Sequence, residues 1–250
     1  MPSYDTAVSP SPAFIPSALA GTLAIQIADQ IGNAITEEKF APGERLREVS
    51  LAETFNVSRA TIRDALRILE SRALVKILPQ RGAQVALLST AELMNLFDIR
   101  AALVALASRR AAERYVPTHE PVLAAGYARL KAAQKDANAY ARASAMLVAD
   151  IAGLSGNDQL AEMLAGFAQR IGRYARLGLA TPKRRSQSLT NWAKLIDAIV
   201  AGDAELADAT HRTLAHDNRD AAIAEIAARK RAEATPVAKR TRRARASDAA

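Results

Sequence analysis

The sequence lacks cysteine altogether, and only 4% of its residues are aromatic. Without cysteine, neither a disulfide nor a thiolate metal site can form, which fits a protein of the reducing cytoplasm. Half of the chain is hydrophobic and alanine dominates, a composition that favours closely packed helices over sheets. A secretory signal pattern is also absent, as is any apolar run long enough to cross a bilayer. We therefore expect a cytoplasmic protein with no membrane partner.

The formal net charge of +8 is concentrated near the end of the chain. Eight basic and two acidic residues lie between Arg229 and Ala250, which gives this segment a charge of +6. Because the remainder is close to neutral, the overall charge says little about a nucleic-acid-binding fold elsewhere. Residues 229–250 are predicted to form a basic disordered tail.

Hydrophobic spacing divides the rest of the chain into three segments. Residues 1–18 show no periodicity and are predicted to be a disordered leader. Residues 19–88 show three helical stretches followed by an alternating, strand-like pattern around a turn at 79–82, which predicts a β-hairpin. Residues 89–228 show helical periodicity only. Helices are expected near 90–115, 119–136, 138–153, 158–179, 187–201 and 204–228.

Local signals mark several element boundaries. Asn56 lies where a tight turn needs a left-handed residue, and Ser58 is a suitable N-cap for the helix that follows. Ser89 and Glu92 have the spacing of a capping box. The predicted fold is mainly α: an N-terminal winged helix-turn-helix of three helices plus a β-hairpin, followed by an all-α antiparallel helical bundle.

The helix after Ser58 separates charge from apolar surface. On a helical wheel Arg59, Arg63 and Arg67 lie on one side, opposite an apolar stripe. The stripe comprises Ile62, Ala65, Leu66 and Leu69. Exposed arginines are commonly only solvated charge, but a planar guanidinium can also grip a guanine edge or a phosphate. The short helix and tight turn before this helix favour DNA reading, because they have helix-turn-helix proportions.

These features together resemble the winged helix-turn-helix of GntR transcription regulators. The matching motifs are Pro42–Glu48, Leu51–Glu53, Val57–Arg59, Arg63–Leu66, Leu69–Glu70, Leu74–Val75 and Pro79–Ala83. The resemblance implies DNA contacts from Ser58, Arg59, Thr61 and Arg63 in the recognition helix, from Arg81 and Gly82 at the wing tip, and from Arg47 near a phosphate. Ala60–Ile62 replaces a common Thr-Pro-Val, so the operator preference is expected to differ.

The second half is similar to the FCD effector domain of the FadR subfamily. The similarity runs from Leu96–Arg100 through Ser155–Asn157 to Ala198–Asp203. Many members hold a divalent metal with one Asp and three His. Those four positions fall on Ser144, Val148, Trp192 and Leu214. His211 and His216 flank Leu214 but are expected to point elsewhere, so we predict no metal and no other cofactor.

Two interpretations of the effector site remain open. Val104, Val148, Trp192 and Leu214 would make the cavity apolar, and Arg100 matches an arginine of the family. In the first interpretation the pocket takes an amphipathic acid, with Arg100 pairing the carboxylate and Trp192 stacking on the body. In the second the pocket has collapsed into core, Arg100 forms a structural ion pair, and the domain only dimerises.

Three functions are to be weighed for this sequence. The first is a homodimeric transcription regulator that binds a double-stranded DNA operator and responds to a small-molecule effector. The second, an enzyme, lacks support because the chain has no phosphate-binding glycine loop, no cysteine nucleophile and only three histidines. The third is a constitutive, architectural DNA-binding protein that relies on the basic tail.

Overall fold

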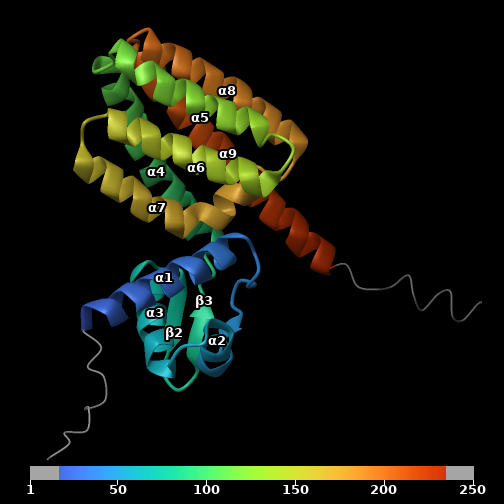
Figure 1. Ribbon diagram of the computed structural model, residues 1–250. Coiled ribbons are helices and arrows are strands. Elements are labelled where there is room, and N and C mark those ends of the chain that lie inside the picture. Colours follow the sequence, from blue (N-terminus) through green and yellow to red (C-terminus); the bar gives the residue numbers. More distant parts are fainter. Residues whose placement is uncertain (1–16, 235–250) are drawn as a thin grey trace, which may run out of the picture. The chain divides into compact units, whose positions relative to one another are not determined.

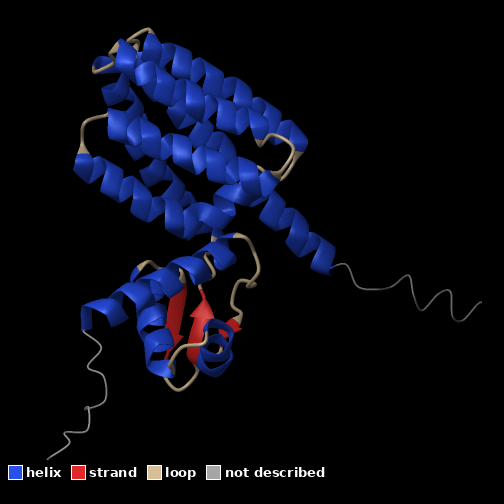
Figure 2. Cartoon of the chain, in the orientation of Figure 1, coloured by secondary structure: helices blue, strands red, loops and turns tan. Residues whose placement is uncertain are grey.

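The computed structural model describes residues 17–234 and is mainly helical, as the sequence predicts (Figures 1 and 2). Most of the predicted leader and most of the predicted basic tail, residues 1–16 and 235–250, lie outside the described residues. The described chain divides into two compact units. Residues 17–35 and 39–86 form the winged unit, whereas residues 36–38 and 87–234 form the helical unit.

The winged unit contains three helices and a small antiparallel sheet. Its elements are α1 (Ser17–Thr36), β1 (Arg45–Leu46), α2 (Glu48–Phe55), α3 (Arg59–Ser71), β2 (Val75–Leu78) and β3 (Gly82–Val85). The sheet order is β1-β3-β2, so the predicted hairpin gains a third strand. β1 is not predicted from the sequence, because a strand of two residues is too short to show an alternating pattern.

Capping residues set the boundaries of α2 and α3. Asn56 ends α2 with a φ of 51°, which confirms the predicted left-handed turn. The Ser58 side chain accepts a hydrogen bond from the Thr61 amide at 3.1 Å and begins α3, as predicted. The core beneath these helices is formed by Ile27, Ile31, Ile35, Leu46, Ile62, Leu66, Leu69, Val75 and Val85.

The helical unit is built from long helices joined by short connections. They are α4 (Thr90–Glu113), the 3-10 turn η1 (Pro117–His119), α5 (Glu120–Ala132), α6 (Ala137–Leu154), α7 (Asp158–Leu177), α8 (Pro182–Val200) and α9 (Ala204–Ala234). In Figure 1, α8, α5, α6 and α7 follow one another across the unit, and α4 and α9 lie behind them. None of the helices described here is long and apolar enough to cross a membrane.

Two helix boundaries in this unit differ from the prediction. α8 begins at Pro182 rather than at 187, because Thr181 caps it by accepting from the Arg184 amide at 3.2 Å and proline suits the first turn. α9 continues to Ala234, so residues 229–234 are helical and not part of a disordered tail. By contrast, the predicted capping box between Ser89 and Glu92 is confirmed at the start of α4.

Candidate nucleic-acid interface and effector site

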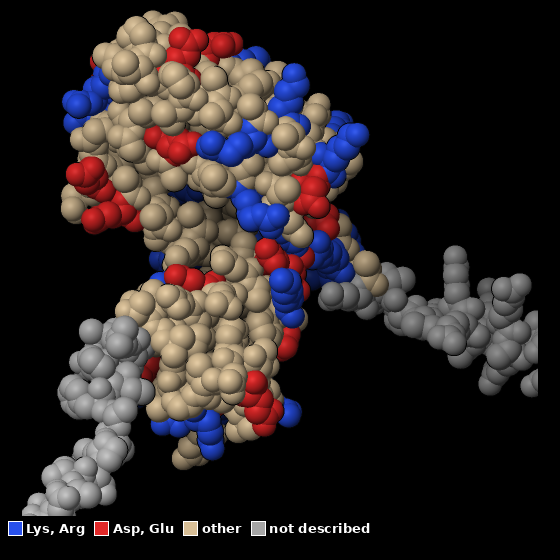
Figure 3. All heavy atoms as spheres, viewed as in Figure 1, with Lys and Arg blue, Asp and Glu red and all other residues tan. Residues whose placement is uncertain are grey.

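α3 presents its arginines to solvent and its apolar stripe to the core. Ile62, Ala65, Leu66 and Leu69 are all buried, as predicted. The side chains of Arg59, Arg63 and Arg67 are 63%, 51% and 68% exposed. The predicted separation of exposed arginines from a buried apolar stripe is therefore confirmed. Basic side chains are visible at the lower end of the winged unit in Figure 3.

Glu48 of α2 is an unforeseen neighbour of these arginines. Its carboxylate accepts two hydrogen bonds from Arg63, at 3.3 Å from Nε and 3.1 Å from Nη2, and lies 3.9 Å from Arg59 Nη2. The hydrogen bond from Arg63 lowers the pKa of Glu48, and the charges of Arg63 and Arg59 add to this effect against a smaller desolvation cost. The two guanidinium groups therefore share one carboxylate within the winged unit.

The remaining predicted DNA contacts occupy open positions of the winged unit. Arg47 directly precedes α2, and Arg81 lies at the tip of the hairpin between β2 and β3, with both residues exposed. Gly82 has a φ of 76°, a conformation that L side chains rarely adopt, so glycine is required for this turn. The Ser58 hydroxyl lies 2.8 Å from Thr61 Oγ1 besides capping α3. A ligand at this end of α3 would meet two neighbouring hydroxyl groups.

In the helical unit, the four apolar residues predicted for the effector site lie in one buried cluster. Val104 of α4, Val148 of α6, Trp192 of α8 and Leu214 of α9 are each at most 7% exposed. They come from four different helices, so the bundle brings together residues that are far apart in the sequence. The fourth metal-ligand position of the family, Ser144, lies one turn before Val148 on α6 and is partly buried.

Arg100 lies one turn before Val104 on α4 and has no anionic partner among the described residues. Part of its side chain reaches solvent, yet desolvation lowers the pKa of the guanidinium to about 10. It therefore stays charged at neutral pH. A desolvated cation without a carboxylate is unusual in a protein interior.

His211 belongs to the same buried region, so the prediction that it points away from Leu214 is wrong. It is 1% exposed, its Nδ1 lies 2.6 Å from the Ser108 hydroxyl, and its ring meets Trp192 edge-on at 5.2 Å between centroids. Burial lowers the pKa of His211 to about 3, and the charge of Arg100 contributes. The spacing could have revealed this, because residues three apart on a helix, such as His211 and Leu214, share a face.

The residues at the family's metal-ligand positions do not fit a divalent metal. Val148, Trp192 and Leu214 offer no donor atom, and Ser144 offers only a hydroxyl. Residues 17–234 contain no group of three or more His, Cys, Asp or Glu side chains that could hold an ion. His211 alone would supply a single nitrogen. No chemistry is therefore assigned to a bound metal at this site.

Because His211 is buried and neutral, the stability of the helical unit should depend on pH. The folded pKa of about 3 lies below the ordinary value of 6.5, so the unfolded chain binds more protons between these values. We expect the free energy of unfolding to fall as the pH drops below 6.5, by up to about 1.4 kcal/mol per pH unit. Urea titrations at several pH values should show this slope and its loss in His211→Gln. The exposed His216 is the control, and equal slopes in wild type and His211→Gln would contradict the assignment.

Comparison with known proteins relates both units to one group of regulators. Residues 23–85 match the family model for "Bacterial regulatory proteins, gntR family", and residues 95–217 match that for the "FCD domain". The chain is 36% identical over 83 residues to the HTH-type transcriptional regulator YdhC of Bacillus subtilis, which is 33% of this chain and 37% of that one. It is 32% identical over 143 residues to the Nta operon transcriptional regulator of Aminobacter aminovorans, 55% of this chain and 65% of that one.

The matched stretches thus span less than two thirds of these relatives' own lengths. A solved structure, that of McbR/YncC from E. coli, superposes with a TM-score of 0.72 at 21% identity, covering 82% of this chain and 98% of that one. At this level of identity the match shows a shared fold.

Proposed function

Because the chain belongs to the GntR family of bacterial regulators with an FCD effector domain, we propose that it is a transcription regulator that binds operator DNA through α3 and the wing. The observation that supports this most directly is α3 itself. Ser58 fixes its start, its aliphatic edge is buried, and Arg59 and Arg63 face outward. The relatives named above are transcriptional regulators, which favours this role over an enzymatic one. The regulator would act in the cytoplasm, where it meets chromosomal DNA.

Selection of binding sites from a pool of random duplexes tests this function with the full chain. Sequence-specific recognition should enrich one motif within a few rounds, and a homodimer should enrich it as two inverted half-sites. Binding that stays sequence-blind would instead favour the architectural function carried by the basic residues 229–250. Removing residues 231–250 separates the two, since a regulator should keep its motif with a weaker salt dependence.

A homodimer is also part of the proposal. Ile99 and Leu106 of α4 are 49% and 39% exposed and lie two turns apart on one side of the helix. Exposed apolar residues at this spacing are typical of a helix face that packs against another surface. Sedimentation of the wild type and of Leu106→Glu measures the association directly, and a monomeric wild type at micromolar concentration would exclude the dimer.

For the effector, we propose an amphipathic carboxylic acid that pairs with Arg100 and lies against Trp192. Arg100 supports the charged end, because it is desolvated and has no carboxylate partner in the described chain. His211 and Ser108 supply polar atoms beside the apolar residues. Thermal-shift screening of aromatic and aliphatic monocarboxylic acids against their primary amides tests this choice. Acids should raise the melting temperature and their amides should not, and an equal response to both would refute the pairing.

Replacing Arg100 with methionine is expected to stabilise the ligand-free protein. The substitution removes a desolvated charge that the folded chain does not compensate, while it keeps the length of the side chain. We expect the free energy of unfolding to rise by up to about 1 kcal/mol, because part of the side chain already reaches solvent. The same variant should lose the thermal shift produced by carboxylic acids. A destabilised Arg100→Met would show that the guanidinium has a structural partner.

Replacing Glu48 with glutamine is expected to strengthen binding to DNA of random sequence by roughly three- to tenfold. The change frees Arg63 and Arg59 from their shared carboxylate and removes a negative charge near the phosphates. Fluorescence anisotropy with a random duplex, measured at several salt concentrations, reports the affinity and its salt slope. Glu53→Gln on the same helix is the matched control, with an expected change below about twofold. Equal effects of the two variants would exclude the specific role of Glu48.

A further inference from the structure

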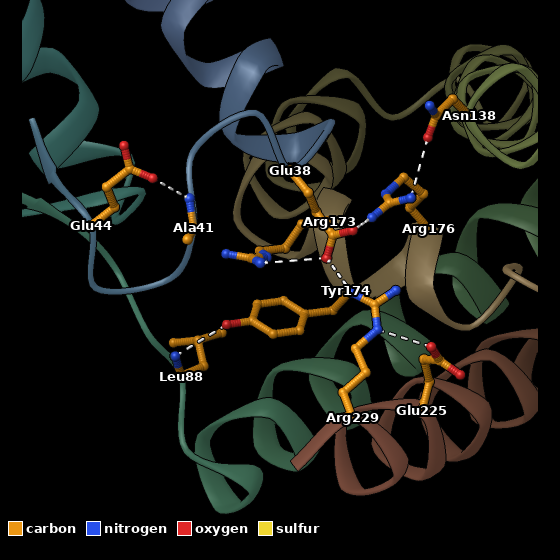
Figure 4. A network of polar contacts seen from close by, with 10 residues as sticks. All are labelled: Glu38, Ala41, Glu44, Leu88, Asn138, Arg173, Tyr174, Arg176, Glu225 and Arg229. Carbon is orange, nitrogen blue, oxygen red and sulfur yellow. Dashed lines mark hydrogen bonds and ion pairs between the residues drawn. The ribbon is translucent and has the colours of Figure 1, made fainter. Parts of the chain in front are cut away.

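Two short segments of the helical unit flank residues 39–86 of the winged unit in the sequence. Residues 36–38 come directly before the start of the long winged segment 39–86, and residues 87–88 come directly after its end. Although separated by almost fifty residues of winged unit, both segments pack against the same region of the helical unit. Figure 4 shows the contacts, which come from Arg173, Tyr174 and Arg176 near the end of α7 and from Arg229 of α9.

The preceding segment is held through Glu38. Its carboxylate forms ion pairs with Arg173 Nη2 at 3.5 Å, with Arg176, and with Arg229 Nη1 of α9 at 2.9 Å. Glu38 itself has a φ of 60°, a left-handed conformation that is uncommon for a residue other than glycine. Three guanidinium groups thus converge on one carboxylate at the point where the chain passes into the winged unit (Figure 4).

The following segment is held through Tyr174. The Leu88 amide donates a hydrogen bond to the Tyr174 hydroxyl at 3.1 Å, and Tyr174 is 4% exposed. Tyr174 lies between Arg173 and Arg176 in the same turn of α7. One turn of one helix therefore contacts the chain both before and after residues 39–86.

The arginine cluster depends strongly on Glu38. The Arg173 side chain is 8% exposed, and its Nε and Nη1 are buried without a hydrogen-bond partner. Arg176 Nε is buried in the same way. Within the described residues, Glu38 is the carboxylate that forms an ion pair with Arg173. Buried guanidinium groups with so few partners are costly, so loss of the Glu38 charge should open this region rather than leave it packed.

α7 also connects this turn with the proposed effector site. Leu160 and Leu164, near its beginning, belong to the buried cluster that contains Val148 and Trp192. Ile171, Tyr174 and Leu177, near its end, belong to a second cluster with α4 and α9. Because α7 is one uninterrupted helix from Asp158 to Leu177, a shift at the first cluster would displace the turn that holds both segments.

We propose that the turn Arg173–Arg176 of α7 is a two-point anchor that holds both chain connections of the winged unit, so that loosening one connection loosens the other. Motion of α7 would then reach the winged unit through both connections together. Control of DNA binding by this anchor rests on the proposed function. The anchoring itself does not, because it can be measured without DNA or effector.

Hydrogen exchange of the full-length protein, followed by mass spectrometry, measures the two connections separately. The first is reported by peptides that cover residues 36–41, where the Lys39 amide donates to the Ala34 carbonyl at 2.9 Å. The second is reported by peptides that cover residues 86–89, which include the Leu88 amide. Each amide is protected in the wild type by one identified hydrogen bond, so faster exchange at either site reports opening there.

Two variants act on opposite connections, and each should loosen both. Glu38→Gln is expected to speed exchange at least tenfold in 36–41 and at least threefold in 86–89. Tyr174→Phe is expected to give the reverse order, with at least tenfold in 86–89 and threefold in 36–41. Glu113→Gln is the control, because Glu113 pairs with Arg110 of its own helix, α4, and should change both peptides less than twofold.

The anchor is overturned if either variant accelerates only its own connection, or if Glu113→Gln acts as strongly as Glu38→Gln. Should Glu38→Gln fail to fold, Tyr174→Phe decides alone, since it removes one hydroxyl and keeps the ring. Faster exchange at both connections then supports the anchor, and faster exchange confined to 86–89 refutes it. None of these outcomes bears on whether the protein binds DNA, so the proposed function is judged independently.

Discussion

Replacing Arg185 with methionine is expected to lower the free energy of unfolding of the helical unit by at least about 3 kcal/mol. Arg185 of α8 is only 4% exposed, and its guanidinium donates hydrogen bonds to backbone carbonyls. Its Nε donates to Gln134 at 2.7 Å, and its Nη1 donates to Leu179 at 2.9 Å and to Ala180 at 2.7 Å. The guanidinium thus joins the α5–α6 connection to the α7–α8 connection.

Methionine retains most of the aliphatic volume of Arg185 but leaves these carbonyls, which are buried or partly buried, without this donor. Each buried acceptor left unpaired costs about 1–3 kcal/mol. Urea unfolding followed by the fluorescence of Trp192, the single tryptophan of the chain, reports the helical unit. Arg184→Met is the control, because the neighbouring Arg184 is more exposed and pairs with Asp217 at 3.8 Å. Its expected loss is below about 1 kcal/mol. Equal losses of unfolding free energy in the two variants would contradict this prediction, because they would mean that water replaces the guanidinium as the donor to these carbonyls.

The features predicted correctly from the sequence are those set by residues close together in the chain. The sequence predicts α3 because its apolar stripe and its N-cap Ser58 lie within a few turns of each other. The same holds for Asn56 at the end of α2 and for the capping box at Ser89. The start of α8 was missed although its signal is equally local, since Thr181 followed by proline is a recognisable N-terminus.

Features that depend on distant pairs were not visible in the sequence. Ser108 and His211 are 103 positions apart, and the periodicity of α4 or α9 alone does not bring them together. Glu48 lies 15 positions from Arg63 on a different helix, so a helical wheel of α3 alone does not predict this contact. Glu38 follows a helix end and has no pattern that would assign it three arginine partners. Tertiary packing created each of these contacts.

The positions of the effector residues follow from the family resemblance, and the structure places these residues close together. Val104, Val148, Trp192 and Leu214 share one cluster, while Arg100 lies a turn away on α4. Resemblance could locate these positions because a helical bundle conserves which turns face inward. It could not show whether a ligand fills the space, because that depends on side-chain chemistry specific to this chain.

Alanine at Arg63 or Arg59 is expected to weaken binding to the selected DNA motif by roughly five- to 150-fold for each substitution, which corresponds to about 1–3 kcal/mol per base contact. Affinity for random DNA should fall only a few-fold, because that binding depends on phosphate contacts, which carry no sequence information, and not on base contacts. The ratio of the two affinities is therefore the informative measurement. It should be made by anisotropy competition at one fixed salt concentration.

Arg67→Ala is the matched control, since Arg67 is 68% exposed on the same helix and pairs with Asp64 at 3.7 Å. It lies about two turns from the start of α3, whereas recognition helices contact bases chiefly with their first turns. We expect its loss to stay below about threefold and to be equal for both DNAs. If Arg67→Ala instead weakened motif binding as much as Arg63→Ala, the helix would be acting through charge alone. Recognition by the first turns of α3 would then be excluded, and the architectural function would account for the binding.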